Sequence, residues 1–177
     1  MHYNSEPWFV HPPLYFWISS ATCELFGWTD FNLRFWESLF GILGLLVTYS
    51  IARLFHSKKT SLYAALITGS SLIYFVIGRL AIFDTMLHTF ILFCLYFFLK
   101  SYQTRTNFLK YSLLAFMCAG LAVLTKGPIG LIQPGAIIFI FLLLKKDLKF
   151  LFNKQIIPAL LVFLIISIPW YSHQLIL

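Results

Sequence analysis

Six long apolar runs, separated by short polar loops, follow one another along this chain of 177 residues. A helix needs about 20 consecutive apolar residues, with a range of roughly 17 to 25, to cross the hydrocarbon core of a bilayer. Charged residues make up only 11% of the chain, against about a quarter in soluble domains, so they could not cover its surface in water. The sequence therefore predicts an all-α fold, a polytopic membrane helix bundle. Its six expected transmembrane helices cover residues 33–55, 61–78, 83–99, 111–125, 128–144 and 156–171.

The basic residues between these runs are divided unequally between the two sides of the membrane. When the loops are assigned alternately to the two sides, ten of the 13 Lys and Arg residues fall on one side. The other side receives Arg34, Arg79 and Lys126. Because cytoplasmic loops carry an excess of basic residues, the side with ten is expected to be cytoplasmic. The net charge of +7 is therefore interpreted as a topology signal, and nucleic acid is excluded as a partner.

The first 32 residues are expected to form an extracytoplasmic loop that precedes a transmembrane helical domain over residues 33–177. Pro12 and Pro13 suit the first turn of a helix, where the missing N–H group is not needed. The segment from these prolines to Trp28 is rich in Tyr and Trp, which favour the membrane–water interface, and several polar residues interrupt it. It predicts a helix that lies along the outer surface of the membrane.

Cysteine spacing gives no sign of a disulfide framework. Cys23, Cys94 and Cys118 are odd in number and widely spaced, so they are interpreted as packing residues. No spacing typical of a metal site is present, and a divalent metal ion is left open as a cofactor.

Asp84 begins the third expected span, in the segment GRLAIFDTMLHTF, and His88 lies four residues later on the same helical face. A carboxylate held beside basic groups can act as a general base or orient an acceptor. The structural alternative is a charge at a helix N-terminus that pairs with Arg79. His88 by itself is interpreted as a packed, hydrogen-bonded histidine.

Lys126, in the segment AVLTKGPIG, ends the fourth expected span at a Gly-Pro turn. Its compact ammonium group suits phosphate or pyrophosphate binding, and the alternative is a lysine that merely snorkels at a helix end. Arg34 lies three residues before Glu37 on one helix, so Arg34 either pairs with Glu37 or serves as a further anion-binding cation.

These polar residues are all expected at the outer rim of the membrane, where they would share one pocket. Cations there would hold a lipid phosphate at headgroup level, a carboxylate would carry out acid–base chemistry, and apolar grooves would take the lipid tail. The residues predicted for this site are catalytic Asp84 and the phosphate-binding residues Lys126, Arg34, Arg79 and His11.

Four motifs, in this order and spacing, resemble those of bacterial membrane glycosyltransferases related to dolichyl-phosphate-mannose–protein mannosyltransferases and to the lipid A aminoarabinose transferase. The matching residues are HPPL at 11–14, LFG at 25–27 with Arg34, Arg79 with Asp84 and Leu87, and GLAVLTKGPIG at 120–130. The resemblance implies the GT-C architecture, with many spans and a catalytic face outside the cytoplasm of the bacterial plasma (inner) membrane. It also implies transfer of a sugar from a polyprenyl-phosphate carrier to a lipid or protein acceptor.

The same resemblance implies roles for individual residues. Lys126 would contact the carrier phosphate, Asp84 would lie in the catalytic cavity, and Arg34 would line that cavity. His11 stands where the family has a lysine that is expected to touch phosphate, and a histidine is charged only part of the time near neutral pH.

The family begins with a further span and continues beyond the last residues of this chain, so we expect a fragment that lacks the first span and the C-terminal part. Two other classes compete with the enzyme. In a polytopic transporter the same charges would line a permeation path, although no internal repeat is evident. In a non-catalytic membrane subunit, the charges would serve assembly.

Overall fold

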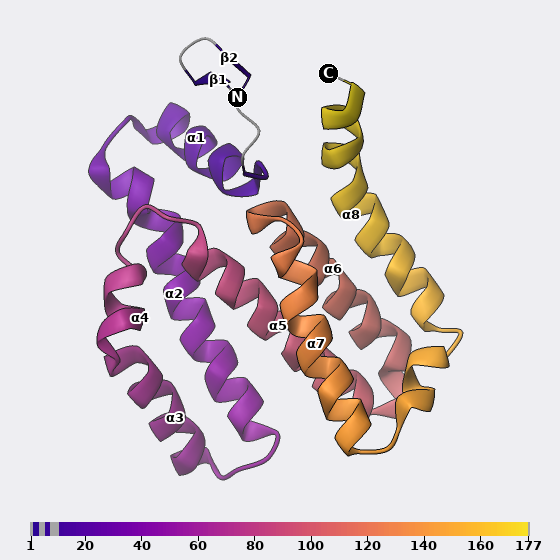
Figure 1. Cartoon of the computed structure of the whole chain (residues 1–177). Helices are drawn as coiled ribbons and strands as arrows, with labels where there is room; N and C mark the ends of the chain where they lie inside the picture. The colour runs from indigo at the N-terminus through magenta and orange to yellow at the C-terminus, as the bar shows by residue number, and fades with distance from the viewer. Residues whose placement is uncertain (1, 4–5, 8–10, 177) are drawn as a thin grey trace.

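The computed structural model describes residues 2–3, 6–7 and 11–176, and helices dominate it (Figure 1). The helices are α1 (Leu14–Phe26), α2 (Asp30–Arg53), α3 (Lys58–Ser70), α4 (Leu72–Ile77), α5 (Asp84–Gln103), α6 (Phe108–Lys126), α7 (Ile129–Leu144) and α8 (Ile156–Ile176). Two 3-10 turns, η1 (Arg105–Asn107) and η2 (Leu148–Phe152), connect helices at one end of the bundle. The predicted all-α membrane bundle is confirmed. Two short antiparallel strands, β1 (His2–Tyr3) and β2 (Glu6–Pro7), were not predicted.

Four stretches of helix are long and apolar enough to cross a bilayer. Three of them are α2, α5 and η1 joined to α6, and the fourth covers Ile156–Gln174 of α8. Helix α7 is equally apolar in character but has only 16 residues. These five helices overlap five of the six runs in which the sequence predicted spans.

The sixth run, residues 61–78, is interrupted by a break at Ser71. The backbone of Ser71 is extended, with φ −66° and ψ 132°, and it separates the 13 residues of α3 from the six of α4. The Ser70 hydroxyl donates to the Ile67 carbonyl at 3.1 Å, and the Ser71 hydroxyl donates to the Thr68 carbonyl at 2.9 Å. Serine side chains that bond to the backbone in this way compete with continued helix formation.

Helix α1 starts directly after the two prolines, with Pro13 at its N-cap, as the sequence predicted. It lies across one end of the bundle (Figure 1). The Trp36 indole N–H donates to the Thr22 hydroxyl at 2.7 Å, which ties α1 to α2. The Trp17 and Trp170 rings meet edge to face at 5.9 Å, which ties α1 to α8. Helix α1 is therefore fastened at two points over the ends of the bundle helices.

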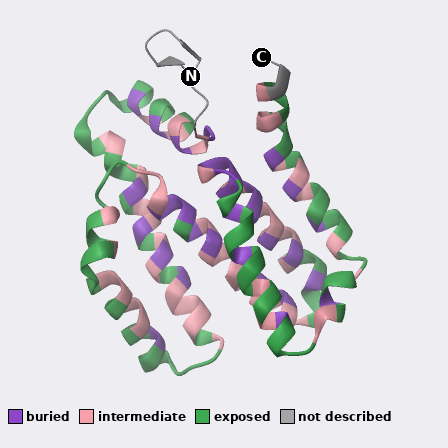
Figure 2. Cartoon of the chain, viewed as in Figure 1, coloured by how far each residue is buried: buried purple, intermediate pink, exposed green. Residues whose placement is uncertain are grey.

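Most of the buried residues lie along α5 and α6 (Figure 2), and many large apolar side chains face outward. One core cluster joins α5, α6 and α8 through Cys94, Ala115, Cys118, Ala119, Val123 and Phe163. Helices α3, α7 and α8 expose large Leu, Ile and Phe side chains along their length. Lipid tails are the natural solvent for such a surface, since water would make its exposure costly. All three cysteines are buried and free.

Candidate active site

The ends of two helices bring together the two most informative polar residues of the sequence. Asp84 is the first residue of α5, and Lys126 is the last residue of α6. The Lys126 ammonium group donates to the Asp84 carboxylate, and the two form an ion pair. More than a third of each side chain remains exposed, with 36% for Lys126 and 39% for Asp84. A ligand can therefore reach both charges.

Arg79, which the sequence suggested as the partner of Asp84, contacts a different residue. Its guanidinium carbon lies 3.9 Å from the centre of the Phe75 ring, in a cation–π contact. Among the residues that the structure describes, the ion pairs are Lys126 with Asp84 and Arg105 with Asp147. Asp84 therefore pairs with Lys126, which is distant in the sequence, and not with Arg79.

The turn after Lys126 explains how the ammonium group is presented at the helix end. Gly127 has φ 86°, a left-handed conformation that residues with a Cβ adopt at a cost, and its N–H donates to the Val123 carbonyl at 2.7 Å. Pro128 then occupies the N-cap of α7. A Cβ on Gly130 would lie 2.4 Å from the carbonyl carbon of Ala122, so only glycine lets α7 start this close to α6.

Phe83, directly before Asp84, connects the ion pair to the N-terminal segment. The His11 ring lies 4.7 Å from the Phe83 ring, and the Lys126 ammonium lies 5.3 Å from the centre of the same ring. The ring of Tyr15 is 6.2 Å from that of Phe83. Thus His11, Asp84 and Lys126 lie around one aromatic side chain. Sequence reasoning missed Phe83, because one aromatic residue among 20 phenylalanines gives no distinguishing signal.

Tyr15, on α1, also belongs to the group of side chains around Phe83. Burial raises the pKa of its phenol, and the nearby Glu37 charge raises this pKa further. Tyr15 therefore keeps its proton at physiological pH, and its hydroxyl donates to the Leu33 carbonyl at 3.3 Å.

Arg34 and Arg79 lie together, but in a hollow separate from the one that Asp84 lines. Their hollow has a volume of about 380 Å³. It is lined by Asp30, Phe31, Arg34, Phe35, Ser38 and Arg79. Asp84 and His88 line a hollow of about 300 Å³ between α4 and α5, together with Tyr74 and Thr85. The structure thus divides the predicted cations between two places, His11 and Lys126 at one and the two arginines at the other.

Arg34 and Glu37 do not pair, although three residues separate them on α2. Arg34 is exposed at the rim, whereas the Glu37 side chain is completely buried. One side chain points to the surface and the other into the protein interior, so the predicted Arg34–Glu37 ion pair is wrong.

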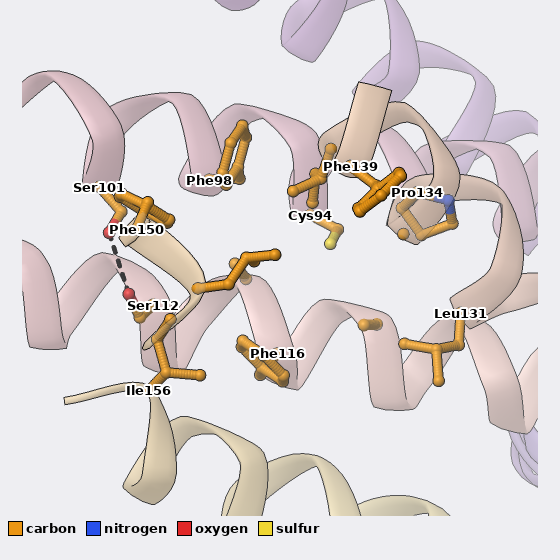
Figure 3. A pocket seen from close by; sticks show the side chains of 15 residues that line it. Cys94, Phe98, Ser101, Ser112, Phe116, Leu131, Pro134, Phe139, Phe150 and Ile156 are labelled. Carbon is orange, nitrogen blue, oxygen red and sulfur yellow. Dashed lines mark hydrogen bonds between the residues drawn. The ribbon is translucent and has the colours of Figure 1, made fainter. Parts of the chain in front are cut away.

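Two apolar hollows lie beyond the Lys126 turn. A hollow of about 310 Å³ lies between α7 and α8, and Leu131 and Tyr171 are among its lining residues. The Tyr171 hydroxyl would lie 3.6 Å from a Cβ on Gly127, so this hollow reaches the turn. Leu131 also lines a deeper cavity of about 280 Å³ between α5, α6 and α7 (Figure 3). The polar contact at its far end is the Ser101–Ser112 hydrogen bond of 2.9 Å.

No three His, Cys, Asp or Glu side chains come together as a metal-binding group within the part of the chain described. Asp84 and His88 supply two such groups to one hollow.

Residues 10–173 match the dolichyl-phosphate-mannose-protein mannosyltransferase family. The chain belongs to this family. The resemblance predicted from its motifs is confirmed, and the match covers every residue proposed for the site.

Named relatives extend the comparison within the mannosyltransferase family. The chain is 28% identical over 170 residues to the undecaprenyl phosphate-alpha-4-amino-4-deoxy-L-arabinose arabinosyl transferase 2 of Proteus mirabilis, covering 92% of this chain and 30% of that protein. It is 35% identical over 173 residues to an uncharacterized protein of Aquifex aeolicus, covering 97% of this chain and 34% of the relative. The chain thus spans about a third of the length of these relatives.

Two crystal structures of ArnT from Cupriavidus metallidurans share the fold of this mannosyltransferase family member. The apo structure superposes with a TM-score of 0.89 at 23% identity, covering 97% of this chain and 33% of ArnT. The structure of ArnT bound to undecaprenyl phosphate superposes with a TM-score of 0.86 at 24% identity, covering 97% and 32%. These similarities establish the membrane helical fold of ArnT for this chain.

Proposed function

We propose that this chain carries the phosphate-binding and acid–base residues of a membrane glycosyltransferase, which moves a sugar from a polyprenyl-phosphate carrier to a lipid or protein acceptor. The observation that carries the proposal is the exposed ion pair of Asp84 and Lys126, since an apolar hollow between α7 and α8 begins at the Gly127–Pro128 turn that follows Lys126. An amphiphilic ligand with a phosphate head and a long apolar tail matches both features. The undecaprenyl phosphate named for ArnT is a ligand of this kind.

Lys126 is the proposed ligand of the carrier phosphate. Its ammonium group is a compact charge on a flexible stem, so it can exchange the Asp84 carboxylate for a phosphate oxygen. His11 contacts the same Phe83 ring as Lys126 and would add a second cationic donor when it is protonated. The sugar linked to that phosphate would then lie beside Asp84.

Asp84 is the proposed catalytic residue. Once Lys126 turns to the phosphate, the carboxylate is free to accept the proton of an acceptor hydroxyl. The acceptor oxygen then bonds to the anomeric carbon of the sugar. The bond between this carbon and the phosphate oxygen breaks, and the polyprenyl phosphate leaves with the electron pair. Lys126 offsets the charge of the departing phosphate.

The polyprenyl tail would occupy the hollow between α7 and α8 and continue toward the deeper cavity lined by Leu131 and Phe116. Burial of a methylene group stabilises a complex by about 0.8 kcal/mol, so a tail placed here would add substantially to the affinity.

Arg34 and Arg79 are proposed to bind a second phosphate-bearing group in their own hollow. Guanidinium groups suit phosphate oxygens because they can donate two parallel hydrogen bonds. The unequal distribution of basic residues supports an active face outside the cytoplasm of the bacterial inner membrane.

Binding of undecaprenyl phosphate to the purified chain in lipid nanodiscs tests this function. Lys126→Met keeps the length of the side chain and removes its charge, and we expect at least about ten-fold weaker binding, since a charge-assisted hydrogen bond contributes about 1.5 to 3 kcal/mol. Lys110→Met is the matched control, because Lys110 is an exposed lysine near the opposite end of the same helix. If Lys126→Met and the unchanged chain bound undecaprenyl phosphate with equal affinity, the proposal would be refuted.

A further inference from the structure

Helix α2 buries one face, and part of this face packs against α5. The buried residues of α2 are Glu37, Gly41, Gly44 and Val47, spaced so that they share one helical face. A Cβ on Gly41 would lie 3.6 Å from the Thr85 methyl group, and a Cβ on Gly44 would lie 3.0 Å from the Thr89 hydroxyl. The Thr89 hydroxyl also donates to the Phe40 carbonyl at 2.8 Å. The two helices therefore cross closely, with Gly41 opposite Thr85.

This register brings Glu37 to the N-terminus of α5. Glu37 lies one helical turn before Gly41, and α5 begins only one residue before Thr85. The Thr85 hydroxyl, the backbone amides of Thr85 and Met86, and the Asp84 carboxylate are the polar groups near its carboxylate. Its side chain is fully buried, so water does not surround it.

Both sides of this contact consist of groups that need a partner. Neither carboxylate oxygen of Glu37 has a hydrogen-bond partner among the described residues, and the Thr85 hydroxyl has none there either. Helix α5 in turn has Phe83 at its N-cap position, which offers no side-chain acceptor for the amides of the first turn. Buried polar groups without partners are rare and costly, so donors and acceptors that face each other in this way should be paired.

We infer that Glu37 is a positioning residue, whose carboxylate caps the N-terminus of α5 from the neighbouring helix and thereby holds Asp84 opposite Lys126. Asp84 is the first residue of α5, so any fraying of that turn moves its carboxylate away from α6. A carboxylate beside a helix N-terminus also interacts favourably with the helix dipole. The significance of this contact for sugar transfer rests on the proposed function, whereas the capping contact itself does not.

Hydrogen exchange and lysine labelling test the inference without any assay of activity. In Glu37→Leu we expect amide exchange in the first turn of α5 to accelerate about three- to thirty-fold, as for the loss of a helix cap. Acylation of Lys126, followed by mass spectrometry of its peptide, should accelerate as well, since the ammonium group loses its carboxylate partner. Exchange in the middle of α5, around Cys94, should stay unchanged.

Two further variants separate capping from packing. Glu37→Gln keeps an acceptor oxygen at the same position and should restore most of the protection. Glu37→Ser is too short to reach the amides but cannot crowd the helix crossing, so it repeats the test if the leucine variant fails to fold. Glu24→Leu changes an exposed glutamate on α1 and serves as the control.

The inference would be overturned if Glu37→Leu and Glu37→Ser both behaved like the unchanged chain. In that case the first turn of α5 would keep its protection from exchange, and Lys126 would be acylated at the same rate. Uniform acceleration along all of α5 would overturn it too, because it would indicate general loosening. Failure of the proposed function would appear elsewhere, as unchanged binding of undecaprenyl phosphate by Lys126→Met.

Discussion

The Asp84 carboxylate and the Lys126 ammonium group lie 42 residues apart in the chain and form an ion pair where α5 begins and α6 ends. The pair is exposed enough for a ligand to reach it, and the apolar hollow between α7 and α8 begins at the turn that follows Lys126. This arrangement leads to predictions about catalysis, binding, stability and topology.

The charge of Asp84 is expected to be required for transfer. Asp84→Asn keeps the shape of the side chain and removes the general base, so sugar transfer from a labelled polyprenyl-phosphate donor should fall by at least about 100-fold. Binding of undecaprenyl phosphate should be retained or tightened, because Lys126 no longer has a competing carboxylate. Asp147→Asn, which removes the partner of Arg105 at 3.5 Å, is the control. Normal turnover by Asp84→Asn would contradict the role given to this residue.

Arg34 and Arg79 are expected to act on one ligand together. Each of Arg34→Gln and Arg79→Gln should weaken binding of a phosphate-bearing lipid at their hollow about three- to ten-fold, and the double variant should fall short of the product of the two effects. Titration of lipid phosphate in nanodiscs, with undecaprenyl phosphate already saturating the Lys126 site, measures these affinities. Arg53→Gln, at the opposite end of α2, should leave them unchanged. Strictly multiplicative effects would argue against a shared ligand.

Gly130 is expected to be essential for the packing of α7 on α6. A Cβ at this position would lie 2.4 Å from the backbone of Ala122, so Gly130→Ala should lower the free energy of unfolding by about 1 to 3 kcal/mol. Gly135→Ala is a control in the same helix, since nothing lies within 4 Å of a Cβ there. Its effect should be neutral or a gain of up to about 1 kcal/mol from helix propensity. Thermal unfolding in detergent ranks the two variants, and equal stability would refute the steric argument.

Trp36 is expected to hold α1 against the bundle through its indole N–H. Trp36→Phe removes the 2.7 Å hydrogen bond to the Thr22 hydroxyl and should loosen α1 by about 1 kcal/mol. Amide exchange in residues 14–26 should then accelerate several-fold, while that in α6 should not change. Trp28→Phe alters a tryptophan that is 70% exposed and should have no such effect.

Helix α1 and the η2 turn are expected on opposite sides of the membrane. Glu24→Cys should react with a membrane-impermeant maleimide added to intact cells, whereas Lys149→Cys should react only after the cells are opened. The native cysteines are buried and give little background. Labelling of Lys149→Cys from outside would reverse the orientation inferred from the basic loops.

Local rules predicted the elements of the fold well because membrane helices are defined by long apolar runs. The start of α1 after Pro13 and the turn at Gly127 also follow from the backbone preferences of single residues. The break at Ser71 was not predicted, since an apolar run gives no sign that serine hydroxyls will donate hydrogen bonds to the backbone carbonyls there.

The partners within the site could not be predicted in the same way. Spacing along one helix offered Arg79 for Asp84 and Glu37 for Arg34, because such rules consider only residues within about one turn. The structure instead pairs Asp84 with Lys126 and buries Glu37 completely. Which helix end meets which depends on the crossing of α2, α5 and α6, and that crossing is set by glycines and threonines whose positions are not evident as a pattern.

Because the Lys126 ammonium group is already paired with Asp84, an anion that binds to Lys126 must compete with this carboxylate. A bare inorganic phosphate must separate the pair and leaves the carboxylate without a donor. A glycosyl phosphate can instead supply sugar hydroxyls that replace the lost ammonium hydrogen bonds. On the proposed function, the ion pair would therefore favour a ligand that carries both an anion and hydrogen-bond donors at the right separation.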